Sequence, residues 1–340
     1  MTPILLRELG PLSDDAWNAI VSGYPDATVF HGAAWHRSLE AARPGRVVRF
    51  GIERGDRTYG HWCGFLVEKF GMKVFGSPLP GTATDYMFPL FHDAPPPEAF
   101  LAAVRTWASS ARVGLVEVGG EYFGDAALAA AGYDLQPTRT YRVDIAGGEE
   151  AVWARLKPAM RNKVRKAEKN GVVVTEDTTP DFPRRFAAML KSVFNRQGIA
   201  PTYDEHRIAV VMTALAGSRE VTALTAAKDG EELASVVLLH DATTSYYWAG
   251  ASYPSAYPVA ANDVIQWRAL QLAIGRGHVR YDACGGGDYK EKFGGELVGL
   301  PAGHMATRPV FGLVRRSVRQ GFRARQALLG AMQRVVGAWR

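Results

Sequence analysis

The second half of the chain opens with a basic stretch, which reads Lys157-Pro158-Ala159-Met160-Arg161-Asn162-Lys163-Val164-Arg165-Lys166-Ala167-Glu168-Lys169-Asn170-Gly171. Its apolar residues recur at the spacing of one helix face, and they are Met160, Val164 and Ala167. Gly171 is a typical residue just beyond the end of a helix. The stretch therefore predicts a long helix over residues 149–170, kinked or broken at Pro158 because proline cannot donate the backbone hydrogen bond.

The same stretch predicts a row of cations on another face of that helix. Arg161, Arg165 and Lys169 follow one another at i, i+4 and i+8, and Lys166 lies beside them. Like charges at this spacing repel one another unless an anion neutralises them. Two interpretations remain open: a ridge that contacts phosphates of RNA, a nucleotide diphosphate or coenzyme A, and a solvated helix face.

Working outward from this stretch, both halves of the chain show the same order of elements: helices, antiparallel strands, a further helix and a last strand. In the second half, Asp229-Gly230 is the dipeptide of a tight hairpin between strands at 221–228 and 232–240. The order predicts an α+β fold with two copies of one unit. The boundary is placed at Gly147-Gly148, which gives domains at 1–147 and 148–307 and a C-terminal segment at 308–340.

A glycine-rich segment follows the last predicted strand and reads Tyr281-Asp282-Ala283-Cys284-Gly285-Gly286-Gly287-Asp288-Tyr289-Lys290-Glu291-Lys292-Phe293-Gly294-Gly295. Glycines permit positive φ angles, so their N–H groups could form a nest for an anion. The loop brings Lys290 and Lys292, either of which could place an ammonium group beside a developing oxyanion. The alternative is a flexible surface turn.

Positive charge is concentrated at the C-terminal end. The chain has 340 residues, a formal net charge of +6 and a pI near 9.3. Eight arginines and no acidic residue lie in 297–340, so residues 1–296 carry 32 basic and 34 acidic residues, a net charge of −2. This excludes a protein that is basic throughout. Apolar residues at helical spacing predict a basic amphipathic helix in 308–340, and docking on the second domain, a membrane surface and tRNA remain open as its partner.

Two cysteines, Cys63 and Cys284, cannot form a disulfide framework or a four-ligand zinc site, and no H-E-x-x-H pair occurs. No metal site is therefore expected, and a reducing cytoplasm fits the cysteine content. Neither a signal peptide nor an apolar run of about 20 residues is visible. We expect a soluble cytoplasmic protein without a transmembrane segment, and peripheral contact with the inner membrane face through the C-terminal helix stays open.

Taken in order, several segments resemble the Fem-type (FemABX-like) aminoacyltransferases, a family built from two tandem GNAT-like domains. The most specific matches are the R-N-x-x-R-K-A-E-K-x-G-V block from Arg161 to Val172 and the Y-K-x-x-F-G-G motif from Tyr289 to Gly295. Weaker matches are Phe30-His31 with Trp35, Trp153, Arg196, Tyr203, the strand Tyr246–Gly250 and Tyr281-Asp282. The resemblance covers about residues 29–295 and implies two GNAT-like domains with mainly antiparallel sheets flanked by helices.

The resemblance also implies roles for individual residues. It places Lys290, rather than Lys292, beside the reacting centre, and it maps an acidic residue of the first domain loosely onto Asp85. Substrate contacts map onto the residues Arg196, Tyr203, Tyr247 and Tyr289, with Arg161 and Arg165 as binders of phosphates or carboxylates. Either Asp85 or a group of the substrate would take the proton of the attacking amine.

The resemblance implies transfer of an aminoacyl group from aminoacyl-tRNA to an amine of a peptide-like acceptor, with no other cofactor. An acyl-CoA-dependent GNAT-type N-acyltransferase is the first alternative. The GNAT diphosphate loop, whose N–H groups hold coenzyme A, is missing, because residues 257–262 lack both its basic residue and its glycines. This favours aminoacyl-tRNA. A further alternative is a protein without catalysis that binds RNA or a membrane surface.

Overall fold

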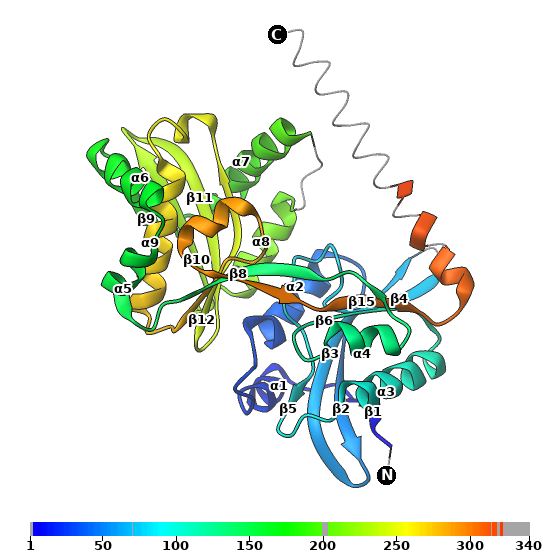
Figure 1. Cartoon of the computed structure of the whole chain (residues 1–340). Helices are drawn as coiled ribbons and strands as arrows, with labels where there is room; N and C mark the ends of the chain where they lie inside the picture. The colour runs from blue at the N-terminus through cyan, green and yellow to red at the C-terminus, as the bar shows by residue number, and fades with distance from the viewer. Residues whose placement is uncertain (1–2, 70, 199–202, 314, 318–319, 322–340) are drawn as a thin grey trace. The chain divides into compact units, whose positions relative to one another are not determined.

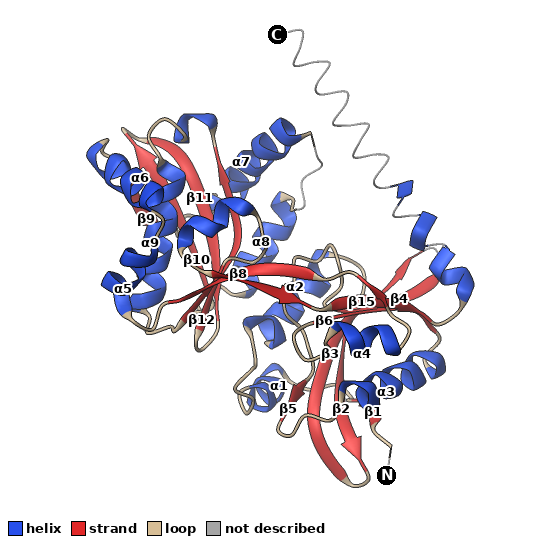
Figure 2. Cartoon of the chain, in the orientation of Figure 1, coloured by secondary structure: helices blue, strands red, loops and turns tan. Residues whose placement is uncertain are grey.

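The computed structural model describes residues 3–69, 71–198, 203–313, 315–317 and 320–321. The chain divides into two compact units, Met1–Thr138 with Gly299–Gly321, and Arg139–Val298. Each unit is a β-sheet with helices packed against it (Figures 1 and 2). The predicted α+β class with two mixed, mainly antiparallel sheets is confirmed.

The sheet of the first unit has eight strands within the described residues, in the order β1-β2-β3-β4-β6-β15-β7, with β5 paired to β3. The pairs are antiparallel, except that β4 and β6 run parallel. The strands are β1 (Leu5–Glu8), β2 (Arg46–Arg54), β3 (Arg57–Lys69), β4 (Met72–Ser77), β5 (Leu90–Phe91), β6 (Val113–Gly119), β7 (Asp134–Leu135) and β15 (Ala302–Ala306).

Helices cover both faces of this sheet, as the alternation of side chains along β2 shows. Phe50 packs in the aromatic core with Trp62 and Trp107, whereas the neighbouring Arg49 donates a hydrogen bond to His36 on the other face. The helices are α1 (Asp14–Val21), which Ser13 caps, η1 (Val29–His31), α2 (Ala33–Ala42), α3 (Pro97–Ser110) and α4 (Asp125–Ala130).

The sheet of the second unit has seven strands within the described residues, in the order β14-β8-β13-β12-β11-β10-β9. The pairs β8 with β13, β12 with β11, β11 with β10 and β10 with β9 are antiparallel, whereas β12 and β13 run parallel. The strands are β8 (Thr138–Asp144), β9 (Val173–Glu176), β10 (Val221–Lys228), β11 (Glu231–His240), β12 (Thr244–Ser252), β13 (Arg280–Asp282) and β14 (Glu296–Leu300).

The predicted break at Pro158 divides the long helix in two, α5 (Gly148–Arg155) and α6 (Pro158–Lys169). Met160, Val164 and Ala167 of α6 are completely buried in one core with α9 (Ala261–Gly275) and the sheet. The opposite face carries α7 (Phe182–Gln197) and α8 (Glu205–Ala214) (Figure 1). Two 3₁₀ helices complete the unit, η2 (Pro254–Ala256) and η3 (Asp288–Phe293).

The strand pairing differs from the predicted domain boundaries at both ends of the second unit. Strand β8, expected to close the first domain, pairs with β13 of the second sheet. Residues 302–306, which the predicted boundary placed in the second domain, form β15, and this strand pairs with β6 and β7 of the first sheet. The local pattern of a strand carries little information on its partner, because pairing depends on cross-strand neighbours that are distant in sequence.

Only the beginning of the predicted C-terminal helix falls on described residues, and it is helical at 309–313 and 315–317. Arg315 donates two hydrogen bonds, of 2.9 and 2.7 Å, to the nearly buried carboxylate of Glu117 in β6. The prediction that this segment docks on the second domain is therefore wrong for its described beginning, which contacts the first unit. The remaining residues of 308–340 lie outside the described part.

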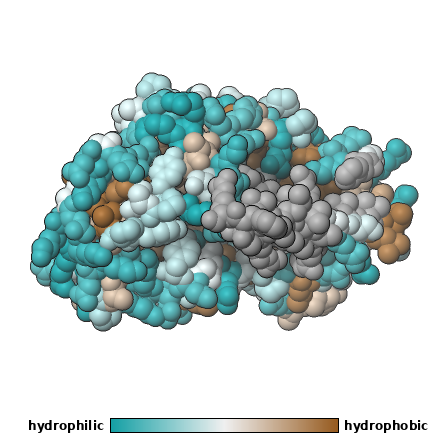
Figure 3. Space-filling model, turned by 90° about the horizontal axis from the view of Figure 1, so that it is seen from above, coloured by the Kyte–Doolittle hydropathy of each residue, from teal (hydrophilic) through white to brown (hydrophobic). Residues whose placement is uncertain are grey.

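In the space-filling view, most of the visible described surface is hydrophilic, and hydrophobic residues form small separate patches (Figure 3). Among the described residues, no helix is both long enough and apolar enough to cross a membrane.

Candidate active site

Strands β12 and β13 of the second unit run side by side for a short distance and then separate. Their parallel pairing covers Thr244–Tyr246 and Arg280–Asp282, after which β13 ends and β12 continues to Ser252. Strand β12 also bulges at this point, because its register with β11 shifts between Tyr247 and Ala249. The segment that follows β13 can therefore enter beside Tyr247.

Lys290 lies in η3 and reaches this separation with its ammonium group. Its Nζ donates hydrogen bonds to the backbone oxygens of Ala283 (2.5 Å) and Cys284 (3.0 Å). It also lies 5.1 Å from the ring centroid of Tyr247 and 5.6 Å from that of Tyr289, and the residue is only 8% exposed. Carbonyl dipoles and aromatic faces thus hold a nearly buried positive charge at one place.

The glycine-rich loop turns its carbonyl oxygens, rather than its amides, towards Lys290. The N–H of Cys284 donates to Asp282 Oδ1 (2.8 Å), and the N–H of Gly285 donates to Thr140 Oγ1 (3.1 Å). The predicted anion nest of glycine N–H groups is therefore wrong for Gly285, because its amide is already bonded within the fold. At Gly286 a Cβ would overlap the exposed side chain of Arg139, so a larger residue there would force that side chain to move.

Three of the predicted substrate-contacting tyrosines gather around the same strand. Tyr247 shares a side-chain hydrogen bond with Tyr289, and burial, with Tyr289 next in effect, raises the pKa of the Tyr247 phenol well above its ordinary value. Tyr203 packs against Trp248 with ring centroids 5.0 Å apart. The charge interaction between Tyr203 and Tyr247 also contributes to the raised pKa of the Tyr247 phenol. The structure therefore brings together Lys290, Tyr247, Tyr289 and Tyr203, which we call the Lys290 cluster.

Lys292, the other lysine of the motif, has a different environment. Its Nζ lies 2.6 Å from Asp263 Oδ1, and the Asp263 side chain is only 6% exposed. Asp263 stands in the first turn of α9, where the helix dipole favours a negative charge. Lys292 thus fixes η3 to α9, and only Lys290 of the two lysines faces the tyrosines.

Arg196 lies at the C-terminal end of α7 and contacts the far end of β12. Its guanidinium donates to the backbone oxygen of Ser252 (3.0 Å) and to Ser192 Oγ (3.0 Å), and it approaches the Tyr257 hydroxyl at 3.5 Å. The residue is exposed. Arg196 therefore ties α7 to the strand that carries Tyr247 while its outer surface remains open to solvent.

The two arginines of α6 differ in their contacts. One terminal nitrogen of Arg161 donates to the backbone oxygens of Trp153 (3.3 Å), Ala154 (2.7 Å) and Leu156 (3.1 Å), which closes the C-terminal end of α5. Arg165 is exposed and lies over the Trp153 ring at 5.4 Å. Exposed cations thus remain on this face, whereas Arg161 also supports the helix junction.

Asp85 belongs to the first unit, in the loop between β4 and β5, and is half-buried. His31 helps to fix this loop: its Nδ1 accepts the N–H of Thr28 (3.0 Å), and its Nε2 lies 2.9 Å from the Phe88 oxygen. Burial lowers the pKa of His31 to about 4, so its ring is neutral at pH 7 and Nε2 is the donor. The indole N–H of Trp35 also bonds Thr84, next to Asp85.

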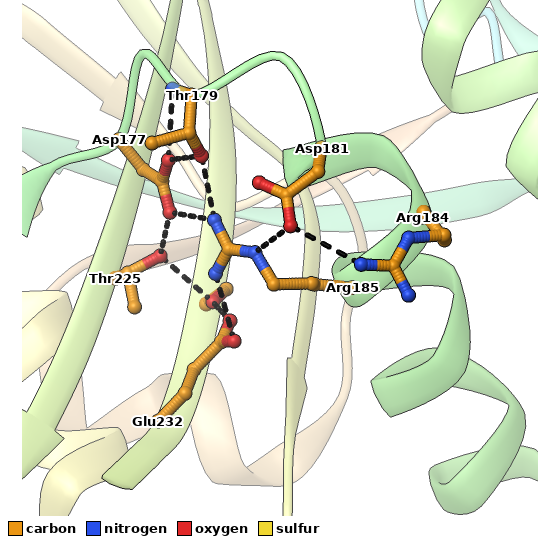
Figure 4. A network of polar contacts seen from close by, with 8 residues as sticks. Asp177, Thr179, Asp181, Arg184, Arg185, Thr225 and Glu232 are labelled. Atoms are coloured by element: carbon orange, nitrogen blue, oxygen red, sulfur yellow. Dashed lines mark hydrogen bonds and ion pairs between the residues drawn. The ribbon is translucent and has the colours of Figure 1, made fainter. Parts of the chain in front are cut away.

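A separate polar network surrounds Arg185 of α7 (Figure 4). Arg185 contacts the carboxylates of Asp177 (2.7 Å), Asp181 (3.2 Å) and Glu232 (2.9 Å), and its hydrogen bond to Asp177 is the main reason that its pKa is raised. An open cavity of about 710 Å³ lies along this network. None of the residues that line it belongs to the Lys290 cluster. With its nitrogens all bonded, Arg185 serves to fix α7 to the sheet.

Three residues bind the glycine loop or one another beneath it, and the sequence assigned a role to none of them: Thr140 and Arg142 were not singled out, and Asp282 appeared only as a weak match of the resemblance. Asp282 is 1% exposed and lies within hydrogen-bond distance of Thr140 Oγ1 (2.6 Å) and Arg142 Nε (3.2 Å). A carboxylate near the end of a predicted strand, three residues before the first of three glycines, was the available signal. Its meaning depended on β8 being the neighbour of β13, which the sequence did not reveal.

Comparisons with known proteins agree with this architecture. Residues 154–292 match the family model described as an acetyltransferase (GNAT) domain. No curated protein matches the chain. The fold is similar to the crystal structure of FemX, with a TM-score of 0.70 and 14% identity, covering 91% of this chain and 99% of that one.

Two further solved structures are similar over most of their length. One is a tandem GNAT protein from the clavulanic acid biosynthesis pathway, with a TM-score of 0.55, 12% identity and coverage of 90% and 99% of the two chains. The other is L-PGS from Bacillus licheniformis, with a TM-score of 0.54, 13% identity and coverage of 91% and 98%. Residues 154–292 therefore match a GNAT domain, and the chain as a whole has the fold of tandem GNAT proteins such as FemX.

Proposed function

We propose that the protein transfers an aminoacyl group from aminoacyl-tRNA to an amine of a peptide-like acceptor, such as a peptidoglycan precursor or an amino-sugar metabolite. The observation that carries this proposal is the ammonium group of Lys290, held nearly buried where β12 and β13 separate. A fixed positive charge in a poorly hydrated place is suited to stabilise the oxyanion of acyl transfer.

In the proposed reaction, the acceptor amine attacks the ester carbonyl of the aminoacyl-tRNA. The carbonyl electrons move onto oxygen, and Lys290 stabilises that oxyanion. The attack forms the carbon–nitrogen bond, and collapse of the intermediate restores the carbonyl group and breaks the bond to the ribose oxygen, which takes up the proton given up by the amine and leaves as free tRNA. Asp85 or a group of the substrate accepts the amine proton, and no covalent enzyme intermediate is needed.

The beginning of α9 supports aminoacyl-tRNA over acyl-CoA as the donor. Acyl-CoA carries a diphosphate, which backbone N–H groups at a helix N-terminus bind well. Here the first turn of α9 carries the buried carboxylate of Asp263, paired with Lys292 at 2.6 Å. Ala260 precedes the helix in a left-handed conformation, where glycine is usual. An incoming diphosphate would meet this carboxylate.

Acyl-CoA remains the second candidate donor, because the family model that matches residues 154–292 is described as an acetyltransferase domain. The deciding experiment supplies aminoacyl-tRNA and acyl-CoA separately, each with an amine acceptor and each with and without RNase. We expect amide formation from aminoacyl-tRNA that RNase abolishes. Transfer from acyl-CoA that resists RNase would overturn this donor assignment.

A protein without catalysis that binds RNA or a membrane surface gives a different result. Its binding would not depend on Lys290, whereas transfer requires the ammonium group. Lys290→Ala protein that still binds tRNA but forms no amide supports the enzyme. A wild-type protein that binds tRNA and transfers nothing from either donor contradicts it.

A further inference from the structure

We propose that Asp282, acting with Thr140, is a positioning residue for Lys290. It folds residues 283–285 so that two backbone oxygens fix the Lys290 ammonium against Tyr247. The inference rests on the proposed role of Lys290 and adds the residues on which that role depends.

Asp282 shares one face of the second sheet with Arg142 and Thr140. Asp282 of β13 lies directly opposite Arg142 of β8 in an antiparallel pair, and Thr140 lies two residues from Arg142. Residues two apart on a strand share one face, so these three side chains meet on the same side of the sheet. Tyr141 and Val143 of β8 point into the core on the other face.

Asp282 and Thr140 bind each other and two amides of the glycine-rich loop. Asp282 Oδ1 accepts hydrogen bonds from Thr140 Oγ1 (2.6 Å) and from the N–H of Cys284 (2.8 Å), and Oδ2 pairs with Arg142 Nε (3.2 Å). Thr140 Oγ1 in turn accepts the N–H of Gly285 (3.1 Å). Two consecutive amides of the loop are thus bound on the side of Asp282.

The carbonyl groups of Ala283 and Cys284 point towards Lys290. With those two amides bound towards Asp282 and Thr140, the oxygens of Ala283 and Cys284 meet Lys290 Nζ at 2.5 and 3.0 Å. Cys284 adopts φ +49°, a left-handed conformation that is unfavourable for a residue with a Cβ. The hydrogen bond from its N–H to Asp282 holds it there, so the carboxylate determines where the Cys284 oxygen points.

The test uses Thr140, because removing its hydroxyl does not leave the buried Asp282 carboxylate unpaired. Asp282 keeps its contacts with Arg142 and with the N–H of Cys284. Thr140→Val has nearly the same shape and loses both hydrogen bonds, whereas Thr140→Ser keeps them and is the matched control. We expect Thr140→Val to lower kcat by about 10-fold or more, since a small misplacement of a reacting group is costly. KM should stay within about 3-fold, because substrate binding is not the affected step.

A second variant separates this role from general damage to the fold. Glycine accepts positive φ angles readily, so in the Cys284→Gly variant the conformation of residue 284 depends less on its hydrogen bond to Asp282. Placed in the Thr140→Val protein, it should recover part of the lost kcat, as should Thr140→Ser alone. Thr140→Ala removes the same hydroxyl without adding a methyl group, and it replaces the valine variant if that variant does not fold.

The position of Lys290 can also be measured without any activity. Acetic anhydride labels accessible lysines, and mass spectrometry compares Lys290 with the exposed Lys169 in the same molecule. We expect slow labelling of Lys290 in the wild type and in Thr140→Ser, and several-fold faster labelling in Thr140→Val.

The labelling experiment tests the positioning role of Asp282 and Thr140 independently of the proposed aminoacyl transfer. If the wild type transfers nothing from either donor while Thr140→Val exposes Lys290, the proposed function fails and the positioning inference stands. Thr140→Val protein that labels Lys290 as slowly as the wild type overturns the inference, whatever the activity. If the wild type is active, equal kcat values for the valine and serine variants overturn it as well.

Discussion

At the scale of single residues, two lysines two positions apart serve different purposes. Lys290 turns its ammonium to backbone oxygens and the Tyr247 ring, whereas Lys292 neutralises the buried Asp263. In a 3₁₀ helix such as η3, residues two apart do not share a face, since a turn takes three residues. The same chemical group can therefore act on a substrate in one case and hold an element in place in the other.

This difference gives a first prediction. Lys290→Ala should lower kcat by about 10²–10³-fold, the usual cost of losing one donor to an oxyanion. Lys292→Ala should keep kcat but lower the free energy of unfolding by about 1–3 kcal/mol, because Asp263 loses its nearest cation. Steady-state kinetics and chemical denaturation of the two proteins measure both effects. A Lys290→Ala enzyme with wild-type kcat would exclude the proposed role.

At the scale of elements, strand β12 carries Tyr247 and Trp248 and ends at Ser252, which α7 holds through Arg196. Gly250 gives the Tyr247 side chain its space, because a Cβ at this position would overlap the phenol. A phenol is the movable end of a side chain, so an added methyl group should displace the ring rather than unfold the strand.

Gly250→Ala should therefore lower kcat by about 10-fold while the melting temperature changes little, because the ring that faces Lys290 moves. Gly299→Ala is the matched control, since a Cβ at that strand residue meets no atom within 4 Å. Kinetics and thermal melting of both variants test this. Wild-type kcat in the Gly250→Ala enzyme would show that the position of Tyr247 does not matter for transfer.

Helix α6 combines a structural arginine with exposed cations, and these can be separated. Arg161→Ala should lower the free energy of unfolding by about 1–3 kcal/mol, because carbonyl oxygens at the end of α5 lose their donor. Lys169→Glu should lower the free energy of unfolding by no more than about 1 kcal/mol, the effect of one charge at a helix end, but weaken tRNA binding, and more so at low salt, because its charge is exposed.

Denaturation curves and tRNA binding at two salt concentrations distinguish these effects. Unchanged tRNA affinity in Lys169→Glu would favour the alternative in which this face is simply solvated. Equal stability of Arg161→Ala and the wild type would mean that the carbonyl oxygens at the end of α5 find water instead.

At the scale of the whole molecule, each unit has its own buried neutral histidine. Burial lowers the pKa of His31 in the first unit to about 4 and that of His240 in the second to about 3. In the unfolded chain both pKa values return to about 6.5. Between these values the unfolded state binds more protons, so stability falls as the pH drops below about 6.5 and is fully present above it.

We therefore expect the melting temperature to be constant near pH 7.5 and to decrease from pH 6.5 towards pH 4.5. The shift at His31 alone corresponds to about 3 kcal/mol at its acid limit. His31→Gln should flatten part of this decrease, although it lowers stability at neutral pH by removing a bonded ring. Melting curves across this range are the measurement, and a constant melting temperature down to pH 4.5 would contradict the prediction.

Much of the fold was accessible from the sequence, because it depends on local pattern. The break at Pro158, the apolar face of α6 and the hairpin at Asp229-Gly230 all occur where predicted. The repeated order of elements predicted two α+β units, and the fold confirms them. The strands β1, β5, β7, β14 and β15 were missed, since segments of two to five residues carry little readable alternation.

The sequence by itself determined the composition of the candidate site: the Y-K-x-x-F-G-G motif, the tyrosines of β12 and the cations of α6. Tertiary structure alone decided that Lys290 faces Tyr247 while Lys292 pairs with Asp263, that Arg161 supports α5, and that β8 lies beside β13. The physical reason is how far apart along the chain the interacting residues lie. Periodicity and helix breaks depend on neighbours along the chain, whereas a charged group takes its role from partners brought to it by distant strands.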